Sequence, residues 1–326
     1  MKRIITAAVA IGTVLTSLIF ASCGKQESEE KKSVPVIGIS QYGEHPALDN
    51  CRTGFIEGLK EAGLAEGTDF EIDYQNAGFD DNIATQIAQN FSAKNVALMC
   101  GIATNSATAC FAAAEDKNIP VIFNAITDPV KAKLDSGNVT GVSDKLPVEA
   151  QLDLIRKLQP EAKTIGIVYT TSEPNSVSAI EEYKEKAGNY GFKIDDIGVT
   201  AQSEVTQAID TLISRDVDAI SNLTDNNVVG VLASVLDKTN EAGIPVYGSE
   251  VEQVKGGCVA SAGIDYVELG KQAGKMAAKV LRGEAKCTDM PFETVTEYGI
   301  YVNSSALSEM NITLPDDIAS KAVEAE

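Results

Sequence analysis

The chain has no tryptophan and a single histidine, His45, among its 326 residues. A hydrolase with a Ser-His-Asp or Cys-His arrangement would have to rely on this one imidazole, and no GxSxG turn accompanies it. The sequence also lacks a GxxxxGKS or GxxxxGKT phosphate loop and any His/Cys cluster with metal-site spacing. We therefore expect no catalysis, no cofactor and no metal ion, and we interpret His45 as an imidazole at a cleft edge or at the surface.

Basic residues are also scarce, with 27 Lys and Arg against 47 Asp and Glu and a formal net charge of −20. A surface this acidic repels phosphate, so nucleic acid is not an expected partner. Cysteine is sparse and forms no CxxC pair. Beyond Cys23 the number of cysteines is odd, which argues against a disulfide framework and favours small buried hydrophobic residues. The sequence leaves open whether any two of them pair: Cys51, Cys100, Cys110, Cys258 and Cys287.

The N-terminus begins with Met1-Lys2-Arg3, continues with an apolar run from Ile4 to Phe20, and reaches Ala21-Ser22-Cys23 before a polar stretch. This order predicts a lipoprotein signal peptide over 1–22, with lipid on Cys23 and a flexible tether over 23–33. A permanent transmembrane helix is the less favoured alternative, because the run is only about 17 residues long. We expect an extracytoplasmic protein that is anchored to the cell membrane by lipid. It would lie on the outer face of the cytoplasmic membrane or in the periplasm.

From Val34 onward, short β-rich runs alternate with longer amphipathic ones, in two successive series. Such alternation predicts parallel sheets covered by helices on both faces. We expect an α/β protein of two doubly wound lobes, with a ligand cleft beyond the carboxyl ends of the strands. The predicted strands are Val34–Ser40, Phe70–Tyr74, Val96–Cys100, Pro120–Phe123, Thr164–Tyr169, Lys193–Ile197, Ala219–Asn222, Pro245–Tyr247 and Cys258–Ala262. The predicted helices are Pro46–Ala62, Asp81–Ala93, Asn105–Lys117, Val148–Leu158, Pro174–Tyr190, Ser203–Ser214 and Asn226–Ala242.

The loops after these strands are polar and rich in acids. They contain none of the five arginines, so a phosphate or a dicarboxylate would lack its usual partner. Several loops open helices, whose N-termini suit a carboxylate, although capping alone explains any single loop. Aromatic rings near the loops are limited to Tyr42, Tyr169, Tyr247 and Tyr266. A zwitterion fits best, and the acids that could hold its ammonium group are Glu44, Asp128, Asp144, Glu173, Asp225, Glu250 and Asp265.

Several segments together resemble the ABC-transporter substrate-binding lipoproteins of the tryptophan/tyrosine-type family. The likeness covers roughly Pro35 to Pro315. It implies a type I periplasmic-binding-protein fold, in which two lobes close on a small solute about a hinge of three crossings. The segments are Gln41-Tyr42-Gly43-Glu44-His45-Pro46-Ala47-Leu48-Asp49, Gly101-Ile102-Ala103-Thr104, Ala125-Ile126-Thr127-Asp128-Pro129-Val130, Gly141-Val142-Ser143-Asp144, Tyr169-Thr170-Thr171-Ser172-Glu173-Pro174-Asn175-Ser176 and Asp225-Asn226.

By that resemblance, the N-terminal lobe is expected to hold residues 34–143 and about 265–291, with the helix Val267–Leu281 docking back on it. The C-terminal lobe is expected to hold 144–264 and about 292–326, and Gly299–Val302 to make the last crossing. The resemblance implies capture of an aromatic amino acid (Trp, Tyr or Phe) by hinge closure and delivery to an ABC permease. We expect a monomer.

Resemblance and loop position together give the candidate ligand-binding residues. As a hypothesis, Asp225 pairs with the ammonium group, Thr104 and the helix end at Asn175-Ser176 take the carboxylate, and Tyr42 or Tyr169 flanks the side chain. The full set is Gln41, Tyr42, Glu44, Thr104, Asn105, Asp128, Asp144, Tyr169, Ser172, Asn175, Ser176, Asp225, Asn226, Glu250 and Asp265.

Two other functions stay open from the sequence. One is a binding protein for a sugar, a nucleoside or another polar solute, and the other is a sensory ligand-binding module. An enzyme that uses His45 with a cleft carboxylate is the least favoured alternative.

Overall fold

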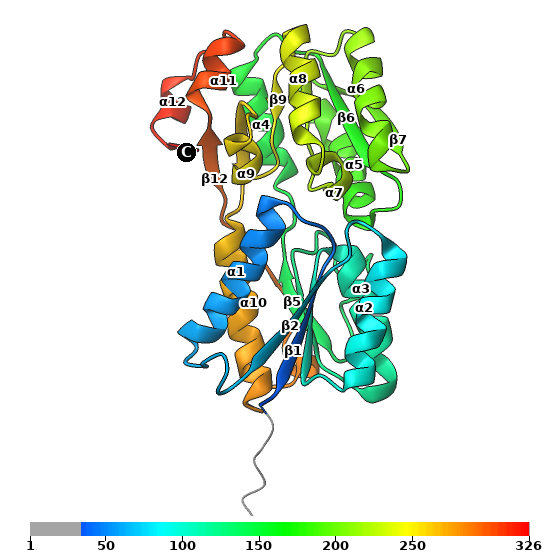
Figure 1. Ribbon diagram of the computed structural model, residues 1–326. Helices are drawn as coiled ribbons and strands as arrows, with labels where there is room; N and C mark the ends of the chain where they lie inside the picture. The colour runs from blue at the N-terminus through cyan, green and yellow to red at the C-terminus, as the bar shows by residue number, and fades with distance from the viewer. Residues whose placement is uncertain (1–33, 326) are drawn as a thin grey trace, which may run out of the picture. The chain divides into compact units, whose positions relative to one another are not determined.

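The computed structural model describes residues 34–325, and the predicted signal peptide, Cys23 and tether lie outside them. The described chain forms two sheets, each covered by helices (Figure 1). The first sheet has the strand order β11-β5-β4-β3-β1-β2, and every neighbouring pair is parallel. Its strands are β1 (Val36–Gln41), β2 (Glu71–Asn76), β3 (Leu98–Ile102), β4 (Val121–Asn124), β5 (Val139–Ser143) and β11 (Glu293–Thr294). Its helices are α1 (Pro46–Glu61), α2 (Asp81–Lys94), α3 (Thr104–Ala114) and α10 (Tyr266–Leu281), with short 3₁₀ turns at Glu115–Lys117 and Cys287–Asp289.

The second sheet has the order β13-β12-β10-β9-β8-β6-β7 and is parallel except where β12 runs antiparallel to β10. Its strands are β6 (Thr164–Thr170), β7 (Lys193–Val199), β8 (Ala219–Ser221), β9 (Val246–Tyr247), β10 (Ala260–Gly263), β12 (Gly299–Val302) and β13 (Ala322–Glu324). The associated helices are α4 (Val148–Leu158), α5 (Pro174–Lys186), α6 (Val205–Ser214), α7 (Asn226–Val229), α8 (Leu232–Ala242), α9 (Val251–Lys255), α11 (Ser304–Glu309) and α12 (Asp316–Ala319), with 3₁₀ turns at Ala187–Tyr190 and Gln202–Glu204.

The chain passes between the two lobes three times, between β5 and α4, between β10 and α10, and between β11 and β12. The first crossing starts after β5, which ends at Ser143. One expectation about the crossings needs correction. Gly299–Val302 is a strand of the second sheet rather than the last crossing, which lies just before it. Since β11 pairs with β5, the first sheet also extends slightly beyond the expected boundary near residue 292.

Close packing of α1 on α10 ties the returning helix to the first lobe. A Cβ atom on Gly54 would lie 2.1 Å from the carbonyl oxygen of Val267, and one on Gly58 would lie 2.2 Å from that of Lys271. Only glycine therefore allows the two backbones to approach this closely. The first lobe has one apolar core that includes residues of both α1 and α10, and two further clusters fill the second lobe.

Two further predictions can be compared with the structure. The helix expected over Asn226–Ala242 is two helices, because the chain leaves helical geometry at Val231 (φ −124°, ψ 23°), just after Gly230. The five cysteines beyond Cys23 are buried and unpaired, which agrees with their predicted role as small buried hydrophobic residues. Among the helices of residues 34–325, none combines the length and the apolar character of a membrane span.

Candidate functional site

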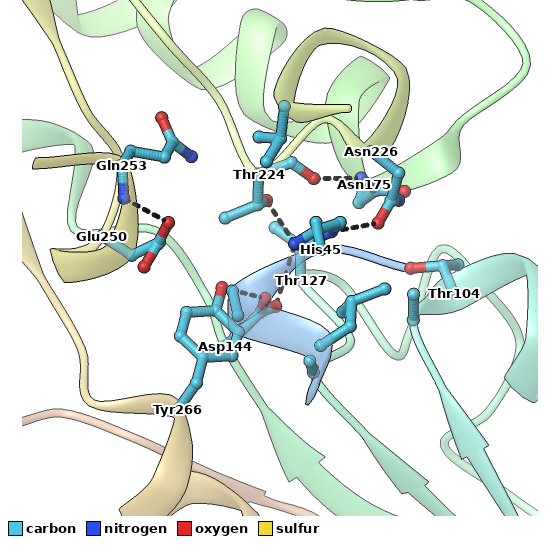
Figure 2. A pocket seen from close by; sticks show the side chains of 15 residues that line it. His45, Thr104, Thr127, Asp144, Asn175, Thr224, Asn226, Glu250, Gln253 and Tyr266 are labelled. Atoms are coloured by element: carbon cyan, nitrogen blue, oxygen red, sulfur yellow. Dashed lines mark hydrogen bonds between the residues drawn. The ribbon is translucent and has the colours of Figure 1, made fainter. Parts of the chain in front are cut away.

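A narrow cavity lies where strand ends of the first lobe meet loops and helix starts of the second (Figure 2). The space between its lining atoms is about 370 Å³, part of which opens to solvent. Residues of both lobes form its wall, so a solute held here would touch both. The lining residues are His45, Ala47, Leu48, Ala103, Thr104, Ala125, Thr127, Asp144, Asn175, Thr224, Asn226, Val229, Glu250, Gln253 and Tyr266.

Two buried carboxyl groups give one part of the wall its acidity. Asp144 is 3% exposed and accepts hydrogen bonds from the Thr127 hydroxyl (3.0 Å) and the Tyr266 hydroxyl (2.7 Å). Glu250 is 2% exposed and accepts from the backbone N–H groups of Glu252 and Gln253. Burial raises the pKa of Asp144, and it raises the pKa of Glu250 to about 7. Within residues 34–325 neither carboxylate forms an ion pair with Lys or Arg, so each would gain from a cationic ligand group.

Three helix N-termini at the cavity carry no side-chain cap within the described residues, namely those of α1, α3 and α5. The first N–H groups of a helix have no partner inside it, so an uncapped end offers donors to an anion, although α1 and α5 each begin with a proline that has no N–H. Ala103, the residue before α3, has φ +70°, and Ala125, after the next strand, has φ +60°. Non-glycine residues adopt such angles at a cost, and both alanines lie on the cavity wall.

Glu173 lies behind the wall and organises two asparagines that line it. One of its oxygens, Oε2, accepts from the side-chain nitrogens of Asn226 (2.6 Å) and Asn175 (3.1 Å) and from the backbone N–H of Asn226 (3.0 Å). The other oxygen accepts from the backbone and side-chain nitrogens of Asn227. Burial and the neighbouring Asp225 raise the pKa of Glu173 to about 8, whereas the hydrogen bonds favour its ionised form.

His45 joins the lobes directly. Its Nε2 lies 3.2 Å from Oδ1 of Asn226, and its ring stacks on Phe79 with an interplanar angle of 3°. Burial lowers the pKa of His45, which favours the neutral imidazole. The buried Nδ1 atom of His45, the hydroxyl of Thr104 and Oδ1 of Asn175 have no hydrogen-bond partner among the described residues. All three residues line the cavity.

Further contacts join the lobes around the cavity. The hydroxyls of Thr127 and Thr224 lie 3.3 Å apart on its wall. Away from it, Ser178 donates to Asp128 (2.8 Å) and Lys131 pairs with an exposed glutamate of the second lobe. The lobes therefore meet in a specific arrangement.

Five of the fifteen sequence-predicted ligand residues lie on this cavity wall: Thr104, Asp144, Asn175, Asn226 and Glu250. The other ten do not line it. Ser176 is buried beside Asn175, whereas Glu44 and Ser172 are exposed. Asp265 is exposed and caps α10.

Asp225 was expected to hold the ammonium group, but both of its carboxylate oxygens accept hydrogen bonds from groups of the second lobe. They accept from the backbone N–H of Thr170 (2.5 Å), its hydroxyl (2.8 Å) and the N–H of Val228 (2.9 Å). This position caps α7 and fixes it to β6. Asp225 is therefore a structural residue in this arrangement.

The tyrosines expected to flank the ligand side chain also lie elsewhere. Tyr42 packs edge-on against Phe79 and donates to Asp81 (2.9 Å), to which Asn105 donates as well. Tyr169 lies under the ammonium group of a lysine. The remaining predicted residues serve other contacts: Gln41 donates to Asp49 and accepts from Arg52, and Asp128 takes part in the contact between the lobes.

Sequence reasoning missed several cavity residues. Thr127 and Tyr266 lie in the loops that the sequence indicated, whereas His45 was interpreted only as an imidazole at a cleft edge or at the surface. Gln253 lies in α9, a short helix that the pattern did not indicate. The apolar part of the wall, which includes Leu48 and Val229, carries no sequence signal that separates it from ordinary core positions.

The sequence matches the family model described as ABC transporter substrate binding protein over residues 36–326. The chain belongs to this family. It is also 37% identical over 294 residues to a tyrosine-binding protein of Clostridioides difficile (strain R20291). The aligned region covers 88% of this chain and 83% of the relative.

Solved structures give the same family and fold. An ABC domain from Streptococcus pneumonia in complex with L-Trp is 34% identical, has a TM-score of 0.86, and the match covers 90% of this chain and 99% of that one. The ligand-free, open structure of a Clostridium difficile substrate-binding protein with adhesive properties is 37% identical with a TM-score of 0.67, over 90% and 100% of the two chains. The fold is that of the type I periplasmic binding proteins.

The family makes this chain an extracytoplasmic substrate-binding protein of an ABC transporter, not an enzyme. The expectation drawn from the single histidine and the missing catalytic motifs is thus confirmed by the family, as are the predicted α/β class and the two lobes.

Proposed function

We propose that this protein captures an aromatic amino acid in its zwitterionic form within the cavity between the lobes. The observation that carries the proposal is the pairing of two buried acids with uncapped helix N-termini around one narrow cavity. A zwitterion is complementary to both, since it brings an ammonium group and a carboxylate together. The names of the 37% and 34% identical relatives favour an aromatic side chain.

In this proposal Asp144 and Glu250 hold the ammonium group and replace the role first given to Asp225. The carboxylate lies at the N-terminus of α3, where the hydroxyl of Thr104 has no partner among the residues described and is free to donate. The side chain packs against the apolar part of the wall, which includes Leu48 and Val229.

Binding is proposed to occur by closure of the two lobes, followed by docking on an ABC permease. The higher TM-score with the L-Trp complex than with the open, ligand-free structure supports a closed arrangement here, because the two relatives are similarly identical to this chain. A ligand that touches both lobes shifts the population toward the closed form. A permease that recognises that form would then receive only loaded protein.

We also propose that Cys23 carries lipid and holds the protein at the membrane. The proposal rests on the basic start, the apolar run and the small residues before this cysteine. The tether that follows would let the lobes reorient while remaining close to a permease.

Calorimetric titration with L-Trp, L-Tyr and L-Phe tests the proposal, together with analogues that lack one charged group. Tyramine lacks the carboxylate, and 3-(4-hydroxyphenyl)propionate lacks the ammonium group. We expect at least one amino acid to bind and both analogues to bind about 100-fold more weakly or worse, because each leaves one buried charge site unpaired. Binding of an analogue as tight as that of the amino acid would contradict the proposed zwitterion site.

A further inference from the structure

We propose that His45 and Asn175 present two fixed hydrogen-bond acceptors to the ligand side chain, so that the site selects an indole N–H or a phenol O–H over a bare phenyl ring. This inference rests on the proposed function and deepens it, because it concerns which aromatic amino acid the same cavity prefers.

Glu173 fixes both asparagine amides. Its Oε2 atom accepts from Nδ2 of Asn226 at 2.6 Å and from Nδ2 of Asn175 at 3.1 Å, and the latter nitrogen also donates to the backbone oxygen of Thr224 at 2.7 Å. Each oxygen of Glu173 also accepts from a backbone N–H group, of Asn226 or of Asn227, and these groups can only donate. The side-chain atoms that face Glu173 and the Thr224 carbonyl are therefore the amide nitrogens. The Oδ1 atoms of both asparagines are therefore acceptors.

This arrangement also fixes the proton on His45. Oδ1 of Asn226 faces Nε2 of His45 at 3.2 Å, and an acceptor in that position requires Nε2 to carry the proton. In the neutral imidazole, Nδ1 then has a lone pair and no proton. Burial favours that neutral form by lowering the pKa of His45.

The result is two buried acceptors without a donor. Nδ1 of His45 and Oδ1 of Asn175 have no partner in the described part of the chain, and both residues line the cavity. They are linked through Asn226 and Glu173, as Figure 2 shows for the contact of His45 with Asn226. An unpaired buried acceptor is costly, so a ligand that supplies a donor is favoured over one that does not.

The acidic groups that we assign to the ammonium lie elsewhere on the wall. Asp144 accepts from Thr127 and Tyr266, and Glu250 accepts from the backbone at the start of α9. His45 and Asn175 are instead bonded to Asn226 and Glu173, and Figure 2 shows Glu250 across the cavity from Asn175 and Asn226. A donor that meets His45 therefore comes from another part of the ligand, and in an aromatic amino acid that part is the ring substituent. Tyrosine and tryptophan carry such a donor, and phenylalanine does not.

The test compares affinities of L-Tyr, L-Trp and L-Phe in the wild-type protein and in two variants of His45. His45→Gln places an amide nitrogen near the position of Nε2 and keeps the contact with Asn226, but removes the acceptor at Nδ1. His45→Asn places an amide oxygen near Nδ1 and removes the contact with Asn226. We expect the wild type to bind L-Tyr or L-Trp at least about 30-fold more tightly than L-Phe.

The ratio of affinities separates recognition from a merely structural role. We expect the preference over L-Phe to fall to a few-fold in His45→Gln and to persist in His45→Asn, even if the latter binds all ligands more weakly. Equal binding of all three amino acids by the wild type would overturn this inference and leave the proposed function intact. Failure of all three to bind would overturn the proposed function instead. If neither His45 variant folds, Asn175→Ala provides the same comparison, and an unchanged preference there would also count against the inference.

Discussion

Replacing Asp144 by Asn removes a buried charge while leaving the shape of the cavity wall nearly unchanged. Both partners of the carboxylate, Thr127 and Tyr266, are hydroxyl groups that can rotate to meet an amide. The substitution therefore separates the charge of Asp144 from its packing. In the proposed site that charge is a counter-ion of the ligand ammonium group.

The expected loss of affinity follows from the burial of this pair. Removing one partner of a buried, hydrogen-bonded charge pair costs about 2–5 kcal/mol of binding free energy. At 1.4 kcal/mol for each factor of ten, the dissociation constant should rise by roughly 30- to 4,000-fold. Stability of the ligand-free protein should change in the opposite direction. Burial raises the pKa of Asp144, so its charge is costly to the folded state at neutral pH, and Asn should leave the melting temperature unchanged or higher.

Calorimetric titration with the best-bound aromatic amino acid measures the dissociation constant. Thermal unfolding without ligand measures the melting temperature. Asp265→Asn is the matched control, because that acid caps α10 from an exposed position outside the cavity. We expect its affinity to stay within about threefold of the wild type. Unchanged affinity in Asp144→Asn would refute the ammonium assignment, and a parallel loss of affinity and stability would mean that Asp144 acts through the fold.

Three further predictions follow from the same structure. The pKa of Glu250 is raised to about 7, and an ammonium group favours the ionised form of this residue, so the affinity for the amino acid should rise as pH increases from about 5.5 to about 7 and level off above it. Titrations at stepped pH would show this rise, and a flat profile would exclude Glu250 as a ligand partner. Gly58→Ala should lower the free energy of unfolding by about 1–3 kcal/mol in denaturant, since its Cβ would lie 2.2 Å from a backbone oxygen of α10. Gly188→Ala is the control, because the space around Gly188 is open, and its effect should stay within about 0.5 kcal/mol. Equal effects of the two substitutions would contradict the packing argument. Cys23→Ser should abolish lipid labelling and release the protein from membranes; continued labelling would place the lipid elsewhere.

The alternation of elements was predictable from sequence because helix and strand periodicities are local. The helix over Val148–Leu158 has the predicted bounds, and α1 begins at the predicted Pro46. The break between α7 and α8 at Val231 was missed, since the residues on both sides continue a helical pattern. Strand β11, which has two residues, forms only by pairing with β5, and a contact so distant in sequence leaves no periodic signal.

The site was predictable as a region but not residue by residue. Polar residues at helix starts either cap their own helix or face the cavity, and the sequence does not distinguish the two. Asp225 and Asp265 turn back to cap, whereas Asn175 faces the cavity because Glu173 holds its amide. His45 acquires its significance from Asn226, which lies in the other lobe. Such roles depend on tertiary contacts between distant segments.

Native mass spectrometry of the purified protein tests the central claim most directly. The protein would be measured as isolated, after unfolding and refolding, and after addition of single amino acids. For the protein as isolated, we predict a bound mass that refolding removes, or an empty site. After refolding, we predict that one aromatic amino acid binds with one molecule per chain. Retention of a sugar or nucleoside mass, with no binding of any amino acid, would contradict the assignment of the cavity to an aromatic zwitterion.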